Sequence, residues 1–196
     1  MSRWERLFDD LESQLESELS AEHADLAAEE ERLRIGRIGL RGRLAASIDS
    51  DAKRPLRLSV LGRELVVIAD ALGRDWVSGR EQLPDGRPGD EVVVPLAAID
   101  GALWSPHQVD STLGAAPTAS LSARIGLAFA LRDLCRRRVA VHVHTREATR
   151  HGTIDRVGRD HFDLAEHPVG SLRRSDAVTG VRTMRFEHVG LVRYPA

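Results

Sequence analysis

Two short segments of this 196-residue chain occur twice, in the same order and at nearly the same spacing. Arg37-Ile38-Gly39-Leu40 returns as Arg124-Ile125-Gly126-Leu127, 87 positions later, and Gly73-Arg74-Asp75 returns as Gly158-Arg159-Asp160, 85 positions later. Chance supplies one short identity far more readily than two in register. The sequence therefore indicates a tandem duplication of one structural unit, and this limits the fold to two similar halves.

The residues around these landmarks predict the same order of elements in both copies. A helix is followed by a strand, a second strand that ends at glycine, a variable loop and a last pair of strands. Apolar residues alternate along the first strand of each copy, as expected of a half-buried strand. The corresponding segments are 36–46 with 122–137, Leu56, Leu58 and Val60 with Val139, Val141 and Val143, 65–72 with 148–157, and 92–99 with 181–189.

Each copy therefore predicts a small, bent and mostly antiparallel β-unit. A unit of about 70 residues suits a five-stranded barrel of marginal stability. Pairing of the two units, or association of several chains, would cover the edges of their sheets. The predicted fold is mainly β with helices (α+β), in which each five-stranded small barrel is preceded by a helix. The predicted boundaries are 1–34 for an acidic helix, 35–104 for the first barrel, 105–119 for a linker and 120–196 for the second barrel.

The N-terminal segment differs in charge from the rest of the chain. Residues 1–31 hold eleven acidic and two basic side chains, whereas the remaining residues hold 26 basic and 19 acidic ones. Apolar residues recur there at close to the helical period, at Trp4, Leu7, Phe8, Leu11, Leu15, Leu19 and Leu26. The pattern predicts an amphipathic helix whose apolar stripe packs on the body or on a partner chain. Its acidic face either is solvated or occupies a basic surface.

The second copy resembles the Sm-like family in two short motifs. The first motif is Gly152-Thr153-Ile154-Asp155-Arg156-Val157-Gly158-Arg159-Asp160-His161-Phe162-Asp163-Leu164, and the second is Met184-Arg185-Phe186-Glu187-His188-Val189. The resemblance spans nearly all of residues 120–194 and, more weakly, 36–104. It implies that His161 stacks on a base, that Arg185 is the cation beside it, and that Asp163 takes the place of the base-reading asparagine. The first-copy equivalents are Trp76, which could stack in the same way, Ser78 and Pro95.

Arginines extend this candidate nucleic-acid site. Arg136, Arg137 and Arg138 crowd the end of the helix over 122–137, and Arg159 lies in the glycine turn. They suit a phosphate-binding patch, although cations at a helix C-terminus also complement the helix dipole. Both interpretations stay open at this point.

Other function classes have less support in the sequence. His142 and His144 share one strand face, but no third ligand is identifiable, so no metal site is predicted. Nucleotide-binding glycine loops and nucleophile elbows are absent, so we expect a protein that is not an enzyme and has no cofactor. With one cysteine, no long apolar run and an acidic start, the expectation is a cytoplasmic protein without membrane contact.

Two functions are therefore considered. The first is a non-enzymatic regulatory protein that binds single-stranded RNA or DNA through the second barrel. The alternative is an interaction or assembly scaffold whose duplicated barrels pair strand edges, with itself or with a protein partner, while the helix recruits a partner. The aspartate at position 163, the proline at position 95 and the 4% aromatic content favour the alternative.

Overall fold

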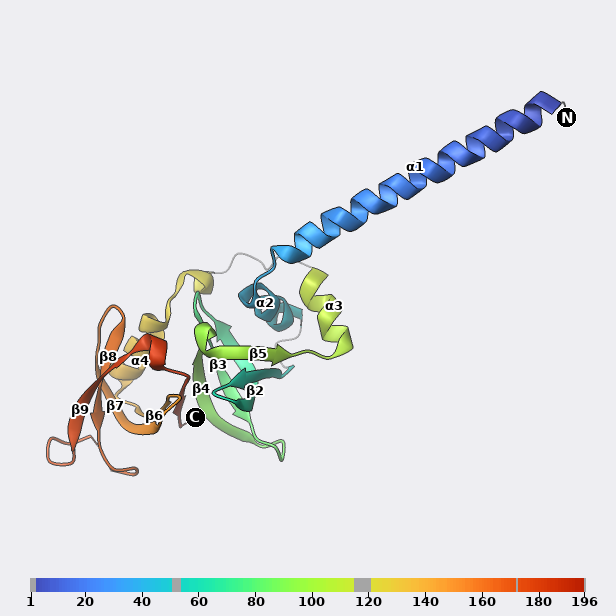
Figure 1. Ribbon diagram of the computed structural model, residues 1–196. Coiled ribbons are helices and arrows are strands. Elements are labelled where there is room, and N and C mark those ends of the chain that lie inside the picture. Colours follow the sequence, from blue (N-terminus) through green and yellow to red (C-terminus); the bar gives the residue numbers. More distant parts are fainter. Residues whose placement is uncertain (1–2, 51–53, 115–120, 172, 196) are drawn as a thin grey trace. The chain divides into compact units, whose positions relative to one another are not determined.

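The computed structural model describes residues 3–50, 54–114, 121–171 and 173–195 (Figure 1). The chain divides into two compact units. One unit ends at Gly39 and contains α1, and the other begins at Leu40 and holds all strands of the described chain. No helix among the described residues has the length and apolar character needed to span a bilayer.

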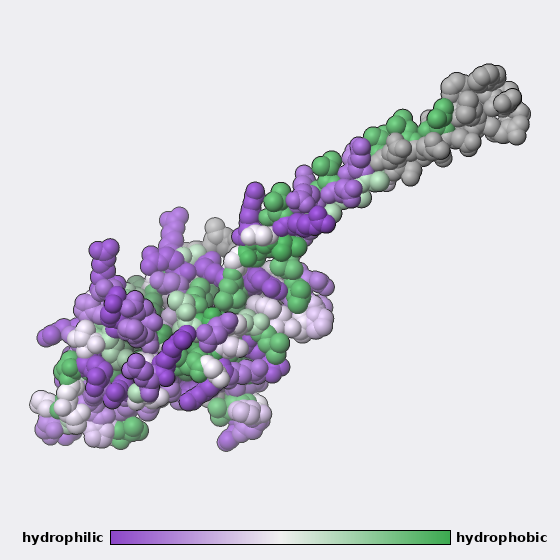
Figure 2. Space-filling view, viewed as in Figure 1, coloured by the Kyte–Doolittle hydropathy of each residue, from purple (hydrophilic) through white to green (hydrophobic). Residues whose placement is uncertain are grey.

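Helix α1 (Arg3–Gly36) occupies the segment for which the sequence predicts an acidic helix. Its leucines from Leu11 to Leu33 are 46–64% exposed, and Figure 2 shows apolar residues among polar ones along its length. Ion pairs of i,i+3 spacing, Arg32 with Glu29 and Arg34 with Glu31, lie near its C-terminal end. The side chains of Trp4, Leu7 and Phe8 lie outside the described ones.

The second unit contains a repeated set of elements. Its first part consists of α2 (Leu40–Ser50), β1 (Leu56–Val60), β2 (Arg63–Leu72), β3 (Trp76–Gln82), β4 (Pro88–Pro95), η1 (Leu96–Ala98) and β5 (Ile99–Leu103). The part that follows residue 120 consists of η2 (Leu121–Arg124), α4 (Leu127–Arg137), β6 (Ala140–His144), β7 (Thr149–Val157), β8 (His161–Glu166), β9 (Gly180–Arg185), η3 (Phe186–His188) and β10 (Leu191–Tyr194). We call α2 with β1–β5 the first repeat and α4 with β6–β10 the second repeat.

The described strands form one antiparallel ten-stranded sheet in the order β5-β1-β2-β3-β4-β10-β6-β7-β8-β9. Each repeat contributes five neighbouring strands in the same internal order. The sequence predicted two five-stranded barrels, whereas the sheet is open and continuous through the pairing of β4 with β10. This pairing covers one edge of each repeat, as expected for two marginal units.

The two repeats share irregularities as well as element order. The β2–β3 register shifts between Ala69 and Ala71, and the β7–β8 register shifts between Ile154 and Arg156, which lie 85 positions later. The same offset aligns Leu56 and Leu58 with Val141 and Val143 rather than with Val139 and Val141. The predicted match of the first strands is therefore wrong by two residues. A shift of two keeps every side chain on its face, so alternation alone does not reveal it.

The segment predicted as a linker contains a helix, α3 (Pro106–Gly114), and residues 115–119 lie outside the described ones. Ser105 begins this helix as a cap, because its Oγ accepts a hydrogen bond from the Gln108 N–H at 3.3 Å. Helix α3 packs against α2, where the Arg43 guanidinium donates to Thr112 Oγ1. Part of the segment predicted as a linker is thus a helix packed against α2.

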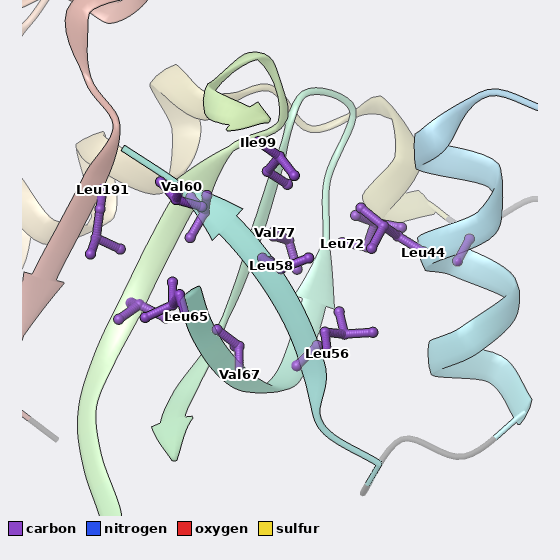
Figure 3. Close-up of a cluster of buried hydrophobic side chains, with 14 residues drawn as sticks. Leu44, Leu56, Leu58, Val60, Leu65, Val67, Leu72, Val77, Ile99 and Leu191 are labelled. Atoms are coloured by element: carbon purple, nitrogen blue, oxygen red, sulfur yellow. The ribbon is translucent and has the colours of Figure 1, made fainter. Parts of the chain in front are cut away.

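Each repeat has its own hydrophobic core, and the two cores exchange residues. The first core contains side chains of α2 and β1–β5, together with Leu191 from β10 (Figure 3). The second core contains side chains of α4 and β6–β10, together with Trp76 and Val93 from the first repeat. The β4–β10 pairing is therefore packed like a domain interior on both faces of the sheet.

Candidate functional site

The most specific arrangement in the molecule is the junction between the repeats, and we define it by β4, β10, the loop 73–76 and the segment 124–127. Strand β10 pairs with β4 so that Val192 lies opposite Val93, Arg193 opposite Val92 and Tyr194 opposite Glu91. The strand pairing supplies backbone hydrogen bonds, and the side chains of Val92 and Val93 are buried beneath it.

The loop 73–76 contacts the segment that leads into α4. The N–H of Arg74 and the indole Nε1–H of Trp76 both donate to the carbonyl of Ile125, at 2.8 and 3.0 Å. The carboxylate of Asp75 accepts a hydrogen bond from the N–H of Leu127 at 2.7 Å. Asp75 thus caps the N-terminus of a helix in the other repeat, where the preceding residue, Gly126, has no side chain to do so.

Gly73 must lack a side chain for this contact to form. A Cβ at this position would lie 2.2 Å from Trp76 Nε1 and 2.7 Å from the Ile125 carbonyl oxygen. Both atoms belong to the hydrogen bond that joins the repeats, so neither can give way without breaking it.

An ion pair crosses the junction between β10 and β3. A terminal guanidinium nitrogen of Arg193 lies 2.9 and 2.8 Å from the two carboxylate oxygens of Glu81, and both side chains are largely buried. Removing one partner of such a pair leaves the other charge poorly solvated. The pair therefore favours one register of β10 on β4.

The residues of the junction are the repeated segments of the sequence. Within the chain, the second occurrence of Arg-Ile-Gly-Leu, at 124–127, contacts the first occurrence of Gly-Arg-Asp, at 73–75. Both segments mark the duplication in the sequence, but neither one identifies Asp75 as a helix cap. Their conservation between the repeats was itself the available signal, because a contact preserves both of its sides.

The residues named from the family resemblance lie together in the second repeat. His161 and Arg185 are direct partners in the β8–β9 pairing, and Asp163 is paired with Thr183 two positions along. The carboxylate of Asp160 accepts a hydrogen bond from His161 Nδ1 at 2.8 Å, which lowers the pKa of Asp160. Asp163 accepts one from Thr183 Oγ1 at 2.7 Å, so its carboxylate is already engaged.

The first-repeat equivalents occupy the same register but a different environment. Trp76 is the β3–β4 partner of Pro95, as His161 is of Arg185, and Ser78 is the partner of Val93, as Asp163 is of Thr183. Trp76 is only 8% exposed and its indole N–H is held by Ile125. Contrary to the expectation from the sequence, its ring offers no stacking surface, because the junction covers it.

The arginines of the predicted patch are mostly engaged with acids. Arg136 and Arg137 pair with Asp133 on α4, Arg138 lies 3.8 Å from Asp155, and Arg185 pairs with Glu187 at 2.9 Å. Arg159 is exposed in the glycine turn. Four of these five arginines thus already have an acidic partner.

A hollow of about 560 Å³ lies between the repeats, beside β9 and the β6–β7 turn. Its charged lining combines Arg146, Arg150, Arg182, Arg185 and His188 with three acidic residues, Asp100, Glu147 and Glu187. Arg182 and Arg150 both reach Glu166 outside this lining set, so part of their charge is already balanced. The hollow is polar, and its excess of cationic groups is small.

The histidines of the second repeat form a row across the sheet. The rings of His142 and His151 are 4.4 Å apart, and those of His151 and His167 are 5.0 Å apart. No group of three potential ligands in the described part of the chain is arranged to hold a metal ion. His144 is half-buried next to β10, and burial, with Arg193 second, lowers its pKa from 6.5 to about 4.

The sheet ends on two strands that the described residues leave unpaired on one side, β5 and β9. Each carries an exposed apolar side chain, Leu103 at 53% and Val181 at 59%. Strand β9 occupies the position in the second repeat that β4 has in the first, and β5 occupies the position that β10 has in the second. The two strands at the ends of the sheet, β9 and β5, are therefore equivalent to the two strands that pair at the junction, β4 and β10.

No protein-family model, curated protein sequence or solved structure matches this chain.

Proposed function

We propose that this protein is a non-enzymatic assembly module built from two Sm-like repeats, which extends its sheet by pairing strand edges. The observation that carries this proposal is the pairing of β4 with β10, because it already joins two equivalent units through the two kinds of strand that remain free as β9 and β5. Open edges of this kind pair readily with another strand.

The junction also explains why assembly is favoured over nucleic-acid binding at His161. The equivalent residue, Trp76, is buried where the repeats meet, and most arginines of the predicted patch face acidic partners. A surface that uses the same loop for association leaves little of it for stacking on a base.

The test is the mass of the full chain as a function of concentration, measured by light scattering coupled to size-exclusion chromatography. We expect masses above the 21.6 kDa of one chain, and a return toward 21.6 kDa when a charge is placed on either edge by Leu103→Lys or Val181→Lys. Val169→Lys is the matched control, since Val169 is 70% exposed in the loop before β9. A wild-type mass of one chain at every concentration contradicts the proposal.

Single-stranded nucleic acid is the second candidate, and the placement of His161 beside Arg185 favours it. If it is correct, a labelled oligonucleotide binds with an affinity that falls steeply with salt, because phosphate contacts release counterions. His161→Ala and Arg185→Ala should each weaken that binding, by about 1–3 kcal/mol where a stacked base is lost. Absence of binding at low salt removes this candidate and leaves the assembly proposal in place.

A further inference from the structure

The two repeated segments are the two sides of a single contact, and the chain uses each of them once. Segment 124–127 and loop 73–76 meet at the junction. Their counterparts, residues 37–40 and 158–161, lie at the start of the first repeat and beside the free strand β9. Residues 37–40 thus correspond to segment 124–127, and residues 158–161 correspond to loop 73–76.

Loop 158–161 already has the conformation that loop 73–76 has in the junction. Gly158 N donates to the His161 carbonyl at 2.8 Å, as Gly73 N does to the Trp76 carbonyl at 2.8 Å. Phe186 N donates to the Asp160 carbonyl at 2.9 Å, as Leu96 N does to the Asp75 carbonyl at 2.9 Å.

An arginine from the preceding helix holds the glycine carbonyl in both loops. Arg41 donates to the Gly73 carbonyl, and Arg132 donates to the Gly158 carbonyl. The loop of the second repeat is therefore preorganised without a partner, which lowers the entropy cost of binding one.

Residues 37–40 repeat the sequence of the other side of the contact. Gly39 precedes α2 as Gly126 precedes α4, and neither glycine offers a side chain to cap its helix. A Cβ on Gly39 would meet no atom within 4 Å, whereas one on Gly126 would lie 2.7 Å from the Arg74 guanidinium. Among the described residues, none covers Gly39 as Arg74 covers Gly126.

We infer that loop 158–161 and strand β9 of one chain bind the start of α2 and strand β5 of a second copy of this chain, in the geometry of the internal junction. This inference rests on the proposed assembly function and names its partner and its contact. Asp160 takes the role of Asp75 and accepts a hydrogen bond from the Leu40 N–H of the second copy. His161 takes the position of Trp76 beside this contact.

The internal junction also fixes the register of the strands. Ala102 of β5 corresponds to Val192 of β10, because they lie opposite the equivalent residues Leu58 and Val143. Transferring the β4–β10 register places Ala102 opposite Thr183, Leu103 opposite Arg182, and Trp104 opposite Val181. The two exposed apolar residues of the edges, Leu103 and Val181, then both become covered.

The contact between copies is weaker than the junction it repeats. Thr183 and Arg182 stand where β4 has Val93 and Val92, and Arg182 already pairs with Glu166, the equivalent of Glu81. The association therefore depends on protein concentration. Because two different surfaces meet, the association is head-to-tail. It gives either a closed ring or an open chain of copies.

Two single substitutions in the full-length chain test the contact from its two sides. Asp160→Ala removes the capping carboxylate, and we expect association about fivefold weaker, the effect of losing one helix cap. Gly39→Asp gives α2 its own cap and places a carboxylate against Asp160, so association should be weaker by tenfold or more. Asp176→Ala, an exposed acid in the loop before β9, is the control.

Mixing Asp160→Ala with Gly39→Asp gives the sharpest readout. Each variant keeps one intact end, so an equimolar mixture should form one-to-one pairs of twice 21.6 kDa at concentrations where either variant alone stays a single chain. Wild-type assembly that neither substitution weakens overturns this inference and leaves edge pairing standing. A wild-type chain that never exceeds 21.6 kDa removes the proposed function as well.

Discussion

Strands β4 and β9 hold equivalent positions in the two repeats and differ in what they pair with. Strand β4 presents Val92, Val93 and Val94, all buried, and β10 pairs with it. Strand β9 presents Arg182 and Thr183 before the buried Met184, and it ends the sheet of the described residues. The comparison shows how one duplicated unit supplies a permanent joint on one side and a protected edge on the other, since charge on an edge strand disfavours uncontrolled pairing.

The same contrast holds for the loops that precede these strands. Trp76 is enclosed by the junction, whereas the side chain of the equivalent His161 is 45% exposed and bonded to the neighbouring Asp160. An indole buries a large apolar area and donates one hydrogen bond, which suits a joint that is always closed. An imidazole keeps its donor while tolerating water, which suits a contact that opens.

The largest expected difference comes from truncating these two rings. Trp76→Ala removes a buried ring and its hydrogen bond, and we expect the free energy of unfolding to fall by about 3–5 kcal/mol. His161→Ala should change it by less than about 0.5 kcal/mol in the single chain, because the ring is partly solvated. Urea denaturation at low protein concentration measures both.

Trp76→Phe keeps this test informative if the alanine variant does not fold, because it retains an aromatic ring while it loses the hydrogen bond to Ile125 and part of the buried ring volume. We expect an intermediate loss of about 1 kcal/mol. Equal losses at positions 76 and 161 would contradict the account of a closed junction and an open edge.

The second prediction concerns pH and the half-buried His144, which lies on β6 next to β10. Unfolded His144 binds a proton near pH 6.5 and the folded protein binds it only near pH 4, so between these values the unfolded state holds more protons. The free energy of unfolding should therefore fall as the pH drops from 6.5 to 4, by on the order of 1–2 kcal/mol for a half-buried group.

His144→Gln should flatten this part of the curve. His107→Gln, on the exposed start of α3, is the control and should follow the wild type. If the stability of the His144→Gln variant falls with pH as steeply as that of the wild type, His144 is not the source of the pH dependence.

The third and smallest contrast is between the two capping aspartates. Asp75→Ala should lower the free energy of unfolding by about 1 kcal/mol, because the N-terminus of α4 loses its acceptor. Asp160→Ala should leave the unfolding of a single chain unchanged and weaken only association. Thermal unfolding of dilute samples separates the two, and a loss of equal size for both would argue against different roles.

Parts of this architecture were predictable from the sequence, since repeated segments report repeated structure. The glycine turns, the alternating strands and the helices before each β-unit lie close to where their patterns place them. The loop between β3 and β4 is shorter than the variable loop that the sequence predicts, because β4 already begins at Pro88 and includes Gly89. Proline is tolerated at the first position of a strand.

The junction itself could not be read from periodicity. Val92, Val93 and Val94 form a run that predicts a strand buried on both faces, but nothing local states which strand covers it. The role of Asp75 depends on a helix 52 positions away, which only the folded chain brings near. Likewise, Trp76 and His161 look equivalent in sequence and differ through the partner that covers one of them.

Hydrogen exchange of the full-length chain, followed by mass spectrometry over a range of protein concentrations, tests the central claim most directly. We predict that protection of β9, β5 and the start of α2 rises together with concentration, while β4 and β10 are protected at every concentration. Edge strands whose exchange does not depend on concentration, or protection that rises only in α1, would contradict the reuse of the junction between copies.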